Sequence, residues 1–131
     1  MNKPKVLIYT PVDESGDSHR RLEDAGCVLK LGAGFWRDFA AEDRNIVEEL
    51  DDTVCALMSV ANRQKPVTRE ALMAAKNLRI ISKYTIGVDD IDVEAATELG
   101  ILVTHYPTEA NWGGVAETAV AMMLNILKKI R

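Results

Sequence analysis

Three polar segments, each following an apolar run, carry the residues best suited to hold a ligand. The first runs from Lys83 to Asp92, and at its centre Gly87 permits a backbone turn that a side chain would resist. Successive main-chain N–H groups in such a turn can form a nest for an anion such as a carboxylate. The segment is therefore predicted to bind an anion through its backbone rather than through a charged side chain.

The second segment, residues 108–117, follows the last apolar run and opens a long helical stretch. Asn111 supplies a short amide there, and the free N–H groups and positive dipole of a helix start also suit an anion. Asn111 could equally cap the helix, and Trp112 could simply pack against its neighbours. Gly113 and Gly114 allow close approach of a backbone, but the G-x-G-x-x-G spacing of a dinucleotide-binding loop is absent.

The third segment, residues 59–63, begins where another apolar run ends. Its small residues leave main-chain amides accessible to a ligand. Arg63 could clamp such a ligand, although a solvated surface arginine is the simpler interpretation.

Other kinds of chemistry find less support in the sequence. Asp89, Asp90 and Asp92 resemble a metal cluster, but we expect Asp92 to cap a helix and the other two to fix the turn, so no metal is expected. His105 lies near the expected cleft without an evident acid partner, and His19 lies in a polar stretch where it is expected to be solvated. No Ser-His-Asp order, H-E-x-x-H motif or P-loop is present.

Length and composition describe one globular domain of 131 residues. A net charge of −4 argues against a nucleic-acid partner, and no apolar run reaches the roughly 18 residues of a membrane span. No signal peptide is visible, so we expect a cytoplasmic protein. Cys27 and Cys55 lie in apolar runs and are expected to be buried, reduced thiols.

Apolar runs alternate with amphipathic stretches along the whole chain, and this order predicts the fold. Strands are expected at residues 6–9, 27–31, 54–58, 79–84 and 101–104, and helices at 19–25, 38–50, 69–76, 93–99 and from about 113 to the end. Continuously apolar strands separated by helices indicate a parallel sheet covered on both faces. The predicted fold is α/β, a flavodoxin-like doubly wound five-stranded parallel sheet in the order 2-1-3-4-5, with a long C-terminal helix. Ligands of such sheets bind beyond the carboxyl ends of the strands, where all three segments fall.

The segment from residue 78 to residue 117 resembles the D-isomer-specific 2-hydroxyacid dehydrogenases, the group that includes D-3-phosphoglycerate, D-lactate, glyoxylate and formate dehydrogenases. The family pattern reads G-V-G-x-D-N-I-D, then A-A, G-I, a P-T step, and N-x-x-x-V-A-E before a long helix. The corresponding letters here are T-I-G-V-D-D-I-D at 85–92, A-A at 95–96, G-I at 100–101, P-T at 107–108 and N-W-G-G-V-A-E at 111–117. Lys83 stands where arginine is frequent, and Gly114 where serine is common.

The resemblance implies how the parent protein is organised. Residues 1–112 would form a flavodoxin-like substrate-binding domain, and residues 113–131 the beginning of a linker helix between domains. A Rossmann domain that binds NAD or NADP and carries the catalytic arginine, glutamate and histidine would lie outside these residues, as would a helix that returns to complete this domain. The chain alone is therefore expected to be inactive, to contain no catalytic residue and to bind no cofactor.

The resemblance also implies a set of site residues for a small 2-hydroxy or 2-oxo acid. The backbone at Ile86 and Gly87 would meet the substrate carboxylate, with Thr85 in place of the motif's first glycine. Asn111 matches a substrate-contacting asparagine, and Trp112 a position beside the nicotinamide in some members. The complete substrate-binding set implied is Val60, Ala61, Thr85, Ile86, Gly87 and Asn111.

Two other interpretations are a non-catalytic flavodoxin-like module and a half-protein made to test whether this half folds alone. A phosphoacceptor domain would need an aspartate at the end of the third strand, where Met58 and Ser59 stand. A flavin-binding module would need a phosphate loop after the first strand, where residues 10–14 are too acidic.

The mostly apolar helix at 113–131 is expected either to pack back onto the sheet or to pair with a second copy as a homodimer.

Overall fold

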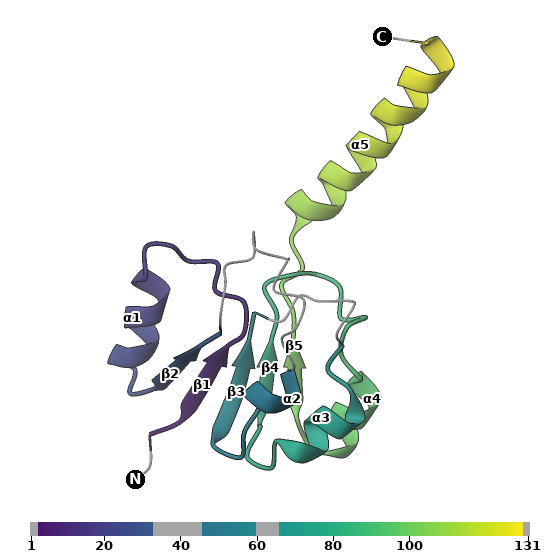
Figure 1. The fold of residues 1–131 in the computed structure, drawn as a ribbon. Coiled ribbons are helices and arrows are strands. Elements are labelled where there is room, and N and C mark those ends of the chain that lie inside the picture. The colour runs from purple at the N-terminus through teal and green to yellow at the C-terminus, as the bar shows by residue number, and fades with distance from the viewer. Residues whose placement is uncertain (1–2, 33–45, 60–65, 130–131) are drawn as a thin grey trace.

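The computed structural model describes residues 3–32, 46–59 and 66–129. Its elements in chain order are β1 (Lys5–Ile8), α1 (Asp17–Asp24), β2 (Val28–Leu31), α2 (Ile46–Glu49), β3 (Val54–Met58), α3 (Arg69–Ala74), β4 (Ile80–Ser82), α4 (Val93–Glu98), β5 (Leu102–Thr104) and α5 (Glu109–Lys128). The strands form one sheet in the order β2-β1-β3-β4-β5, and every neighbouring pair is parallel (Figure 1). This is the predicted α/β fold and strand order.

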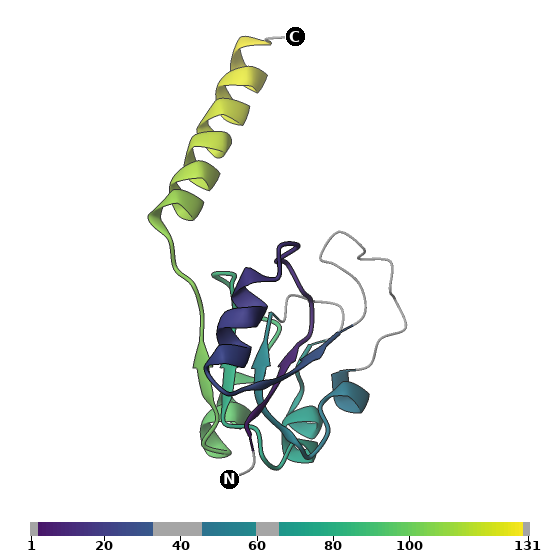
Figure 2. The ribbon, with the colours of Figure 1, turned by 90° about the vertical axis from the view of Figure 1, so that its left-hand side faces the viewer.

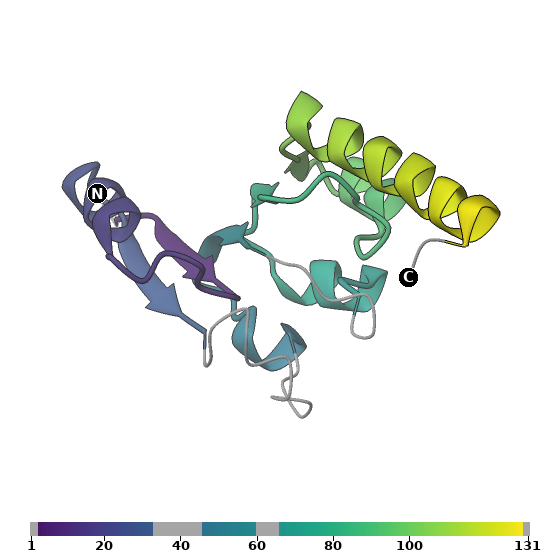
Figure 3. The same cartoon turned by 90° about the horizontal axis from the view of Figure 1, so that it is seen from above.

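The helices are divided unevenly between the two faces of the sheet. The order of the strands reverses direction at β1, and right-handed crossovers therefore place the helix after β1 on the opposite face from the later ones. Seen from above, α1 lies on one side of the sheet and α2, α3 and α4 lie on the other (Figure 3). Both faces thus carry helices, as expected, but among the described helices α1 alone covers one of them.

The hydrophobic core lies between the sheet and the three-helix face. Leu7 of β1, Leu57 of β3 and Ile81 of β4 are each completely buried and belong to one cluster with residues of α2, α3 and α4. Because successive strand residues point to opposite faces, Ala56 and Ile80 belong to the α1 side of the sheet, and both are only half-buried. The packing that holds the fold together is therefore concentrated on one face.

Side-chain caps mark the start of α3 and α4, and the sequence indicated Asp92 as the cap of α4. Thr68 Oγ1 accepts a hydrogen bond from Ala71 N at 3.4 Å, and Asp92 Oδ1 accepts one from Ala95 N at 2.8 Å. Each bond satisfies an amide in the first turn of a helix that has no partner within the helix. Gly100, with φ of 69°, follows α4 and turns the chain into β5.

One prediction about local structure needs correction, and another is tested only in part. Cys27 and Cys55 are free thiols, but both are half-buried rather than buried. Cys27 precedes β2 at the edge of the sheet, and Cys55 lies where the register between β1 and β3 is irregular, so neither occupies a core position. Of the helix expected at 38–50, the structure describes only α2, because residues 38–45 lie outside the described ranges.

An ion-pair network joins β1 and β2 to the loop before β3. Asp51 Oδ2 lies 3.3 Å from Lys5 Nζ and 3.2 Å from Lys30 Nζ, and Lys30 Nζ also donates to the carbonyl of Glu49 at 2.8 Å. A hydrogen bond from the Thr53 hydroxyl holds the pKa of Asp51 well below its usual range, and both lysines lower this pKa further. A carboxyl whose pKa is lowered by folding stabilises the protein above its unfolded pKa, and this contribution is lost as the pH falls.

The last helix, α5, begins at Glu109, four residues before the expected start. Asn111 and Trp112 therefore lie within its first turn rather than ahead of it, and the position that precedes the helix is Thr108. Asn111 consequently does not cap the helix. An acidic residue at the first helical position suits the positive end of the helix dipole, which favours the earlier start.

The same helix projects away from the sheet, and none of the other described strands or helices lies alongside it (Figures 1 and 2). Its described side chains are exposed from residue 114 onward, including large apolar ones such as Ile126 and Leu127. The expectation that it packs back onto the sheet is therefore wrong for this structure. Within the described residues, no helix combines the length and the apolar character needed to cross a membrane.

The core location leads to a stability prediction. Replacing the completely buried Leu57 with alanine should lower the free energy of unfolding by about 2–5 kcal/mol, because the cavity cannot fully collapse. The matched change Leu102→Ala, at a leucine 59% exposed on edge strand β5, should cost less than about 1 kcal/mol. Urea denaturation of both variants measures the difference, and equal losses would contradict the one-sided core.

Candidate functional site

The loop after β4 and the segment after β5 meet at the carboxyl edge of the sheet. We refer to residues 85–89 as the 85–89 turn. Tyr106 N donates to Thr85 O at 3.1 Å, which extends the pairing of β4 and β5 beyond the strands themselves. His105 Nδ1 lies 2.9 Å from Ile86 O. These two contacts tie the turn directly to the residues that lead into α5.

His105 is a residue whose role sequence reasoning missed. A carbonyl oxygen can only accept, so the bond to Ile86 O requires Nδ1 of His105 to carry the proton. In the neutral ring this leaves Nε2 as an acceptor, on an exposed side chain. No spacing rule could have revealed this partner, because it is a main-chain oxygen 19 residues away in the sequence.

The residues expected to meet a substrate carboxylate lie in this turn. Thr85 and Ile86 are half-buried and Gly87 is exposed. Within the described part of the chain, neither Ile86 N nor Gly87 N donates a hydrogen bond. Two successive main-chain N–H groups thus have no acceptor among the described residues at this point of the turn.

Asn111 lies in the first turn of α5, and its side chain is exposed. The five residues between His105 and Asn111 lead from the 85–89 turn to the start of α5, which lies beyond the carboxyl edge of the sheet (Figure 1). Trp112, the residue expected beside a nicotinamide, is 53% exposed in the same helical turn. The amide and the indole are thus available to a molecule bound near the helix start.

The backbone strain lies in a different place from the one predicted. Gly87 is not among the described residues with left-handed φ, whereas Ser59, directly after β3, has a φ of 61°. A serine in this conformation is uncommon, and such strain is concentrated at functional sites. Ser59 N also donates to Ser82 O at 3.1 Å, which joins the ends of β3 and β4. Val60 and Ala61, the expected pocket residues that follow, lie outside the described residues, as does Arg63.

Two buried charged residues, Lys83 and Asp90, flank the 85–89 turn in the sequence. Lys83 Nζ forms an ion pair with Asp90 Oδ1, and the two residues are only 5% and 3% exposed. The sequence suggested that Asp90 merely fixes the turn, whereas it binds the ammonium group at the end of β4 and its carbonyl accepts from Val67 N at 2.8 Å. Among the described residues, no group of three or more His, Cys, Asp and Glu is placed to hold a metal ion.

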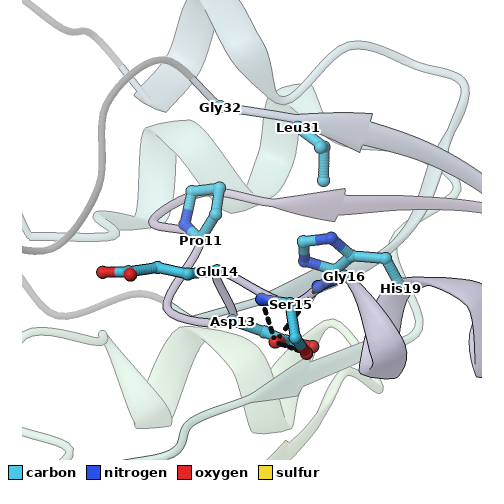
Figure 4. Close-up of a pocket in the computed structure, with 8 residues that line it drawn as sticks. All are labelled: Pro11, Asp13, Glu14, Ser15, Gly16, His19, Leu31 and Gly32. Carbon is cyan, nitrogen blue, oxygen red and sulfur yellow. Dashed lines mark hydrogen bonds between the residues drawn. The ribbon is translucent and has the colours of Figure 1, made fainter.

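A hollow of about 380 Å³ lies at the other end of the carboxyl edge, between the loop after β1 and the end of β2 (Figure 4). It is lined by Pro11, Asp13, Glu14, Ser15, Gly16, His19, Leu31 and Gly32, none of which was predicted as a site residue. Asp13 is fully engaged there, because its carboxylate accepts from Ser15 N at 2.9 Å, Gly16 N at 3.2 Å and Ser18 N at 2.8 Å.

These bonds give Asp13 a structural role. The hydroxyl groups of Ser15 and Ser18, followed by the Ser18 amide, hold the pKa of Asp13 well below its usual range. The carboxylate occupies the amides at the start of α1, where a bound phosphate would otherwise lie in a doubly wound sheet. The hollow is therefore a poor site for a phosphate-bearing ligand, in agreement with the acidic loop noted in the sequence.

The sequence matches a known protein family over most of its length. Residues 6–123 match the profile described as "D-isomer specific 2-hydroxyacid dehydrogenase, catalytic domain". The chain belongs to this family. The match includes the three segments that follow β3, β4 and β5.

Relatives in this family match almost the whole chain at about one-third sequence identity. A D-3-phosphoglycerate dehydrogenase of Archaeoglobus fulgidus is 33% identical over 126 residues, which are 96% of this chain and 22% of the relative. A glyoxylate reductase of Thermococcus litoralis is 33% identical over 131 residues, covering 98% of this chain and 36% of the relative. The chain therefore spans between about a fifth and about a third of the length of these two relatives.

Solved structures of the family match the fold. A glyoxylate reductase from Paecilomyes thermophila superposes with a TM-score of 0.71 at 26% identity, covering 95% of this chain and 38% of that one. An NAD-dependent formate dehydrogenase from Staphylococcus aureus, solved in complex with NAD, gives a TM-score of 0.71 at 26% identity, with 95% and 39% coverage. The family's fold thus accounts for the sheet and the helices described above.

The bond between His105 and the turn leads to a testable prediction. Replacing His105 with alanine removes one hydrogen bond to Ile86 O, so exchange of the neighbouring Tyr106 amide proton should accelerate by up to about tenfold. His105→Asn, which keeps a donor, should restore part of the protection. His19→Ala is the matched control, because His19 lies at the other end of the carboxyl edge. Hydrogen exchange followed by NMR measures all three, and equal rates in all three variants would contradict the contact.

Proposed function

We propose that this chain is the substrate-binding domain of an NAD-dependent oxidoreductase that acts on the CH–OH group of a small D-2-hydroxy acid. Membership of the family supports the reaction class. The observation that carries the proposal is the pair of main-chain N–H groups at Ile86 and Gly87, neither of which donates to another described residue, at the sheet edge where doubly wound folds bind ligands. A substrate of the phosphoglycerate, lactate or glyoxylate type presents a carboxylate that fits two adjacent donors.

In this proposal each residue of the site has a binding role. The N–H groups of Ile86 and Gly87 hold the carboxylate, as main-chain nests do for anions. The side-chain amide of Asn111 contacts the same acid from the first turn of α5, where the helix dipole also favours negative charge. Thr85 completes the turn, and the family resemblance adds Val60 and Ala61, which lie outside the described residues, to the proposed binding set. Binding of this kind orients the acid without transferring a proton.

The cofactor proposed for the parent enzyme is NAD or NADP, which would accept or supply the hydride. The described residues do not fit the dinucleotide by themselves, because Asp13 occupies the amides at the start of α1 and no G-x-G-x-x-G loop is present in the sequence. We therefore assign to this chain only a contact between Trp112 and the nicotinamide, and no catalytic step. Alone, the chain is proposed to bind no cofactor and to have no dehydrogenase activity.

A second copy of the chain is the proposed protein partner. The 20-residue helix α5 exposes a largely apolar surface, with Met122 62% and Ile126 77% exposed. Apolar surfaces of this extent are typical of interfaces, and a two-fold pairing would bury the same surface on both copies. A cytoplasmic location, favoured by the two free thiols, is part of the same proposal.

The proposed homodimer can be tested with two methionines of nearly equal exposure, 62% and 61%. Met122→Lys in α5 should shift the chain from dimer to monomer in sedimentation equilibrium, raising the dissociation constant at least tenfold, because a charge would be desolvated in the interface. Met73→Lys, at a methionine of α3 that is 61% exposed, should leave the dimer unchanged. A wild-type chain that is monomeric at all concentrations would refute the pairing.

The proposed acid-binding site can be tested with two asparagines of the same helix. Titration of the chain with glyoxylate or D-lactate, followed by NMR, should shift the amide signals of residues 85–88 and 111. Asn111→Ala should weaken the binding by about tenfold, the loss expected for one hydrogen bond to a charged group. Asn125→Ala, near the other end of α5, should bind like the wild type. Shifts confined to other parts of the chain would remove the basis of the proposal.

A further inference from the structure

The Lys83–Asp90 pair carries the two buried charges of the described residues. Their side chains are only 3% and 4% exposed, and the ammonium of Lys83 contacts Asp90 Oδ1 directly. Removing two charges from water is costly, and an apolar pair of similar volume is often as stable or more stable. Stability is therefore a weak reason for this chain to keep a buried lysine and a buried aspartate at these positions.

The position of the pair suggests another reason. Lys83 directly follows β4, and Asp90 directly follows the 85–89 turn, so the ion pair closes the base of the loop that contains Ile86 and Gly87. The main chain of Lys83 is fixed as well, because its N–H donates to Thr104 O at 2.9 Å. The two ends of the turn are thus held together by a directional contact between fully desolvated charges.

The pair also connects the turn to the chain on either side of it. The carbonyl of Asp90 accepts from Val67 N at 2.8 Å, and Asp92 N donates to Val67 O at 2.9 Å. On the other side, Thr85 O accepts from Tyr106 N. A displacement of Asp90 would therefore move the turn relative to both the end of the loop after β3 and the segment leading into α5. The proposed binding site requires the turn to keep a fixed position relative to the segment that leads into α5.

We propose that the Lys83–Asp90 pair positions the 85–89 turn for binding of a carboxylate, an inference that rests on the function proposed above. Both residues act through the turn, because neither is exposed to a ligand. The charged pair supplies direction as well as proximity: an ammonium group bonded to one carboxylate oxygen fixes where Asp90 sits, whereas apolar side chains would tolerate several arrangements. A specific turn conformation then presents the two N–H groups together.

Three variants of the full chain separate positioning from a purely structural role. Lys83→Met leaves Asp90 buried without its ammonium partner, and the double variant Lys83→Met/Asp90→Asn removes both charges. Lys83→Arg keeps a positive charge and is the conservative rescue. The control is Lys5→Met, which breaks the half-exposed ion pair with Asp51 at the start of β1.

The first measurement needs no ligand. Amide exchange at Val67, Ile91 and Tyr106 reports on the bonds to Asp90 O, Val88 O and Thr85 O that surround the turn. In the double variant this exchange should be at least tenfold faster than in Lys5→Met, while exchange in β1 and β3 remains that of the wild type. Lys83→Arg, which keeps a charge-assisted hydrogen bond to Asp90, should stay within about threefold of the wild type. Unchanged exchange around the turn in a folded double variant would overturn the positioning role.

The second measurement is the affinity for glyoxylate, measured by NMR titration. The double variant should bind at least tenfold more weakly than Lys5→Met even where its unfolding midpoint in urea equals that of the wild type, and Lys83→Arg should recover the affinity. If the double variant has both the stability and the glyoxylate affinity of the wild type, the pair does not position the turn for binding. A wild-type chain that binds no small carboxylate would refute the proposed function, and the exchange measurement would still decide whether the pair positions the turn.

Discussion

All five strands are parallel, and this shared direction determines where the segments of the candidate site lie. Each of the segments after β3, β4 and β5 is separated from the next by a helix in the sequence, yet the shared direction brings all three to one edge. Hydrogen bonding then continues past the strand ends, from Ser59 to Ser82 and from Tyr106 to Thr85. The candidate site is thus built on the same main-chain pairing that forms the sheet.

The core and the site use different interactions. On the three-helix face, completely buried aliphatic side chains such as Leu57 supply packing that has no direction. At the carboxyl edge, direction matters more, and it is supplied by capping aspartates, by the His105 contact with Ile86 O and by the buried Lys83–Asp90 pair. A separate group of ion pairs, around Asp51, is half-exposed near the start of β1 and β3, away from the site.

Much of the fold could be predicted from the sequence. The five strands, their order and the capping roles of Thr68 and Asp92 follow from apolar runs and short-range polar residues, because these features act within a few residues of each other. The candidate site was predictable as a set of segments, since a parallel sheet sends strand ends to one edge. Its implied residues came from a family motif, which the match over residues 6–123 supports at the level of the family.

Three features were decided only by the tertiary structure. The left-handed φ lies at Ser59, whose N–H also bonds to Ser82 O, and not at Gly87. Asp90 is a buried ion-pair partner, and His105 is a donor to the turn; both contacts join residues that no short-range pattern connects. Local sequence therefore determined which elements form and in what order, since propensity, capping and apolar periodicity act over a few residues. The tertiary structure determined which polar groups are desolvated and paired, because burial depends on how distant segments pack together.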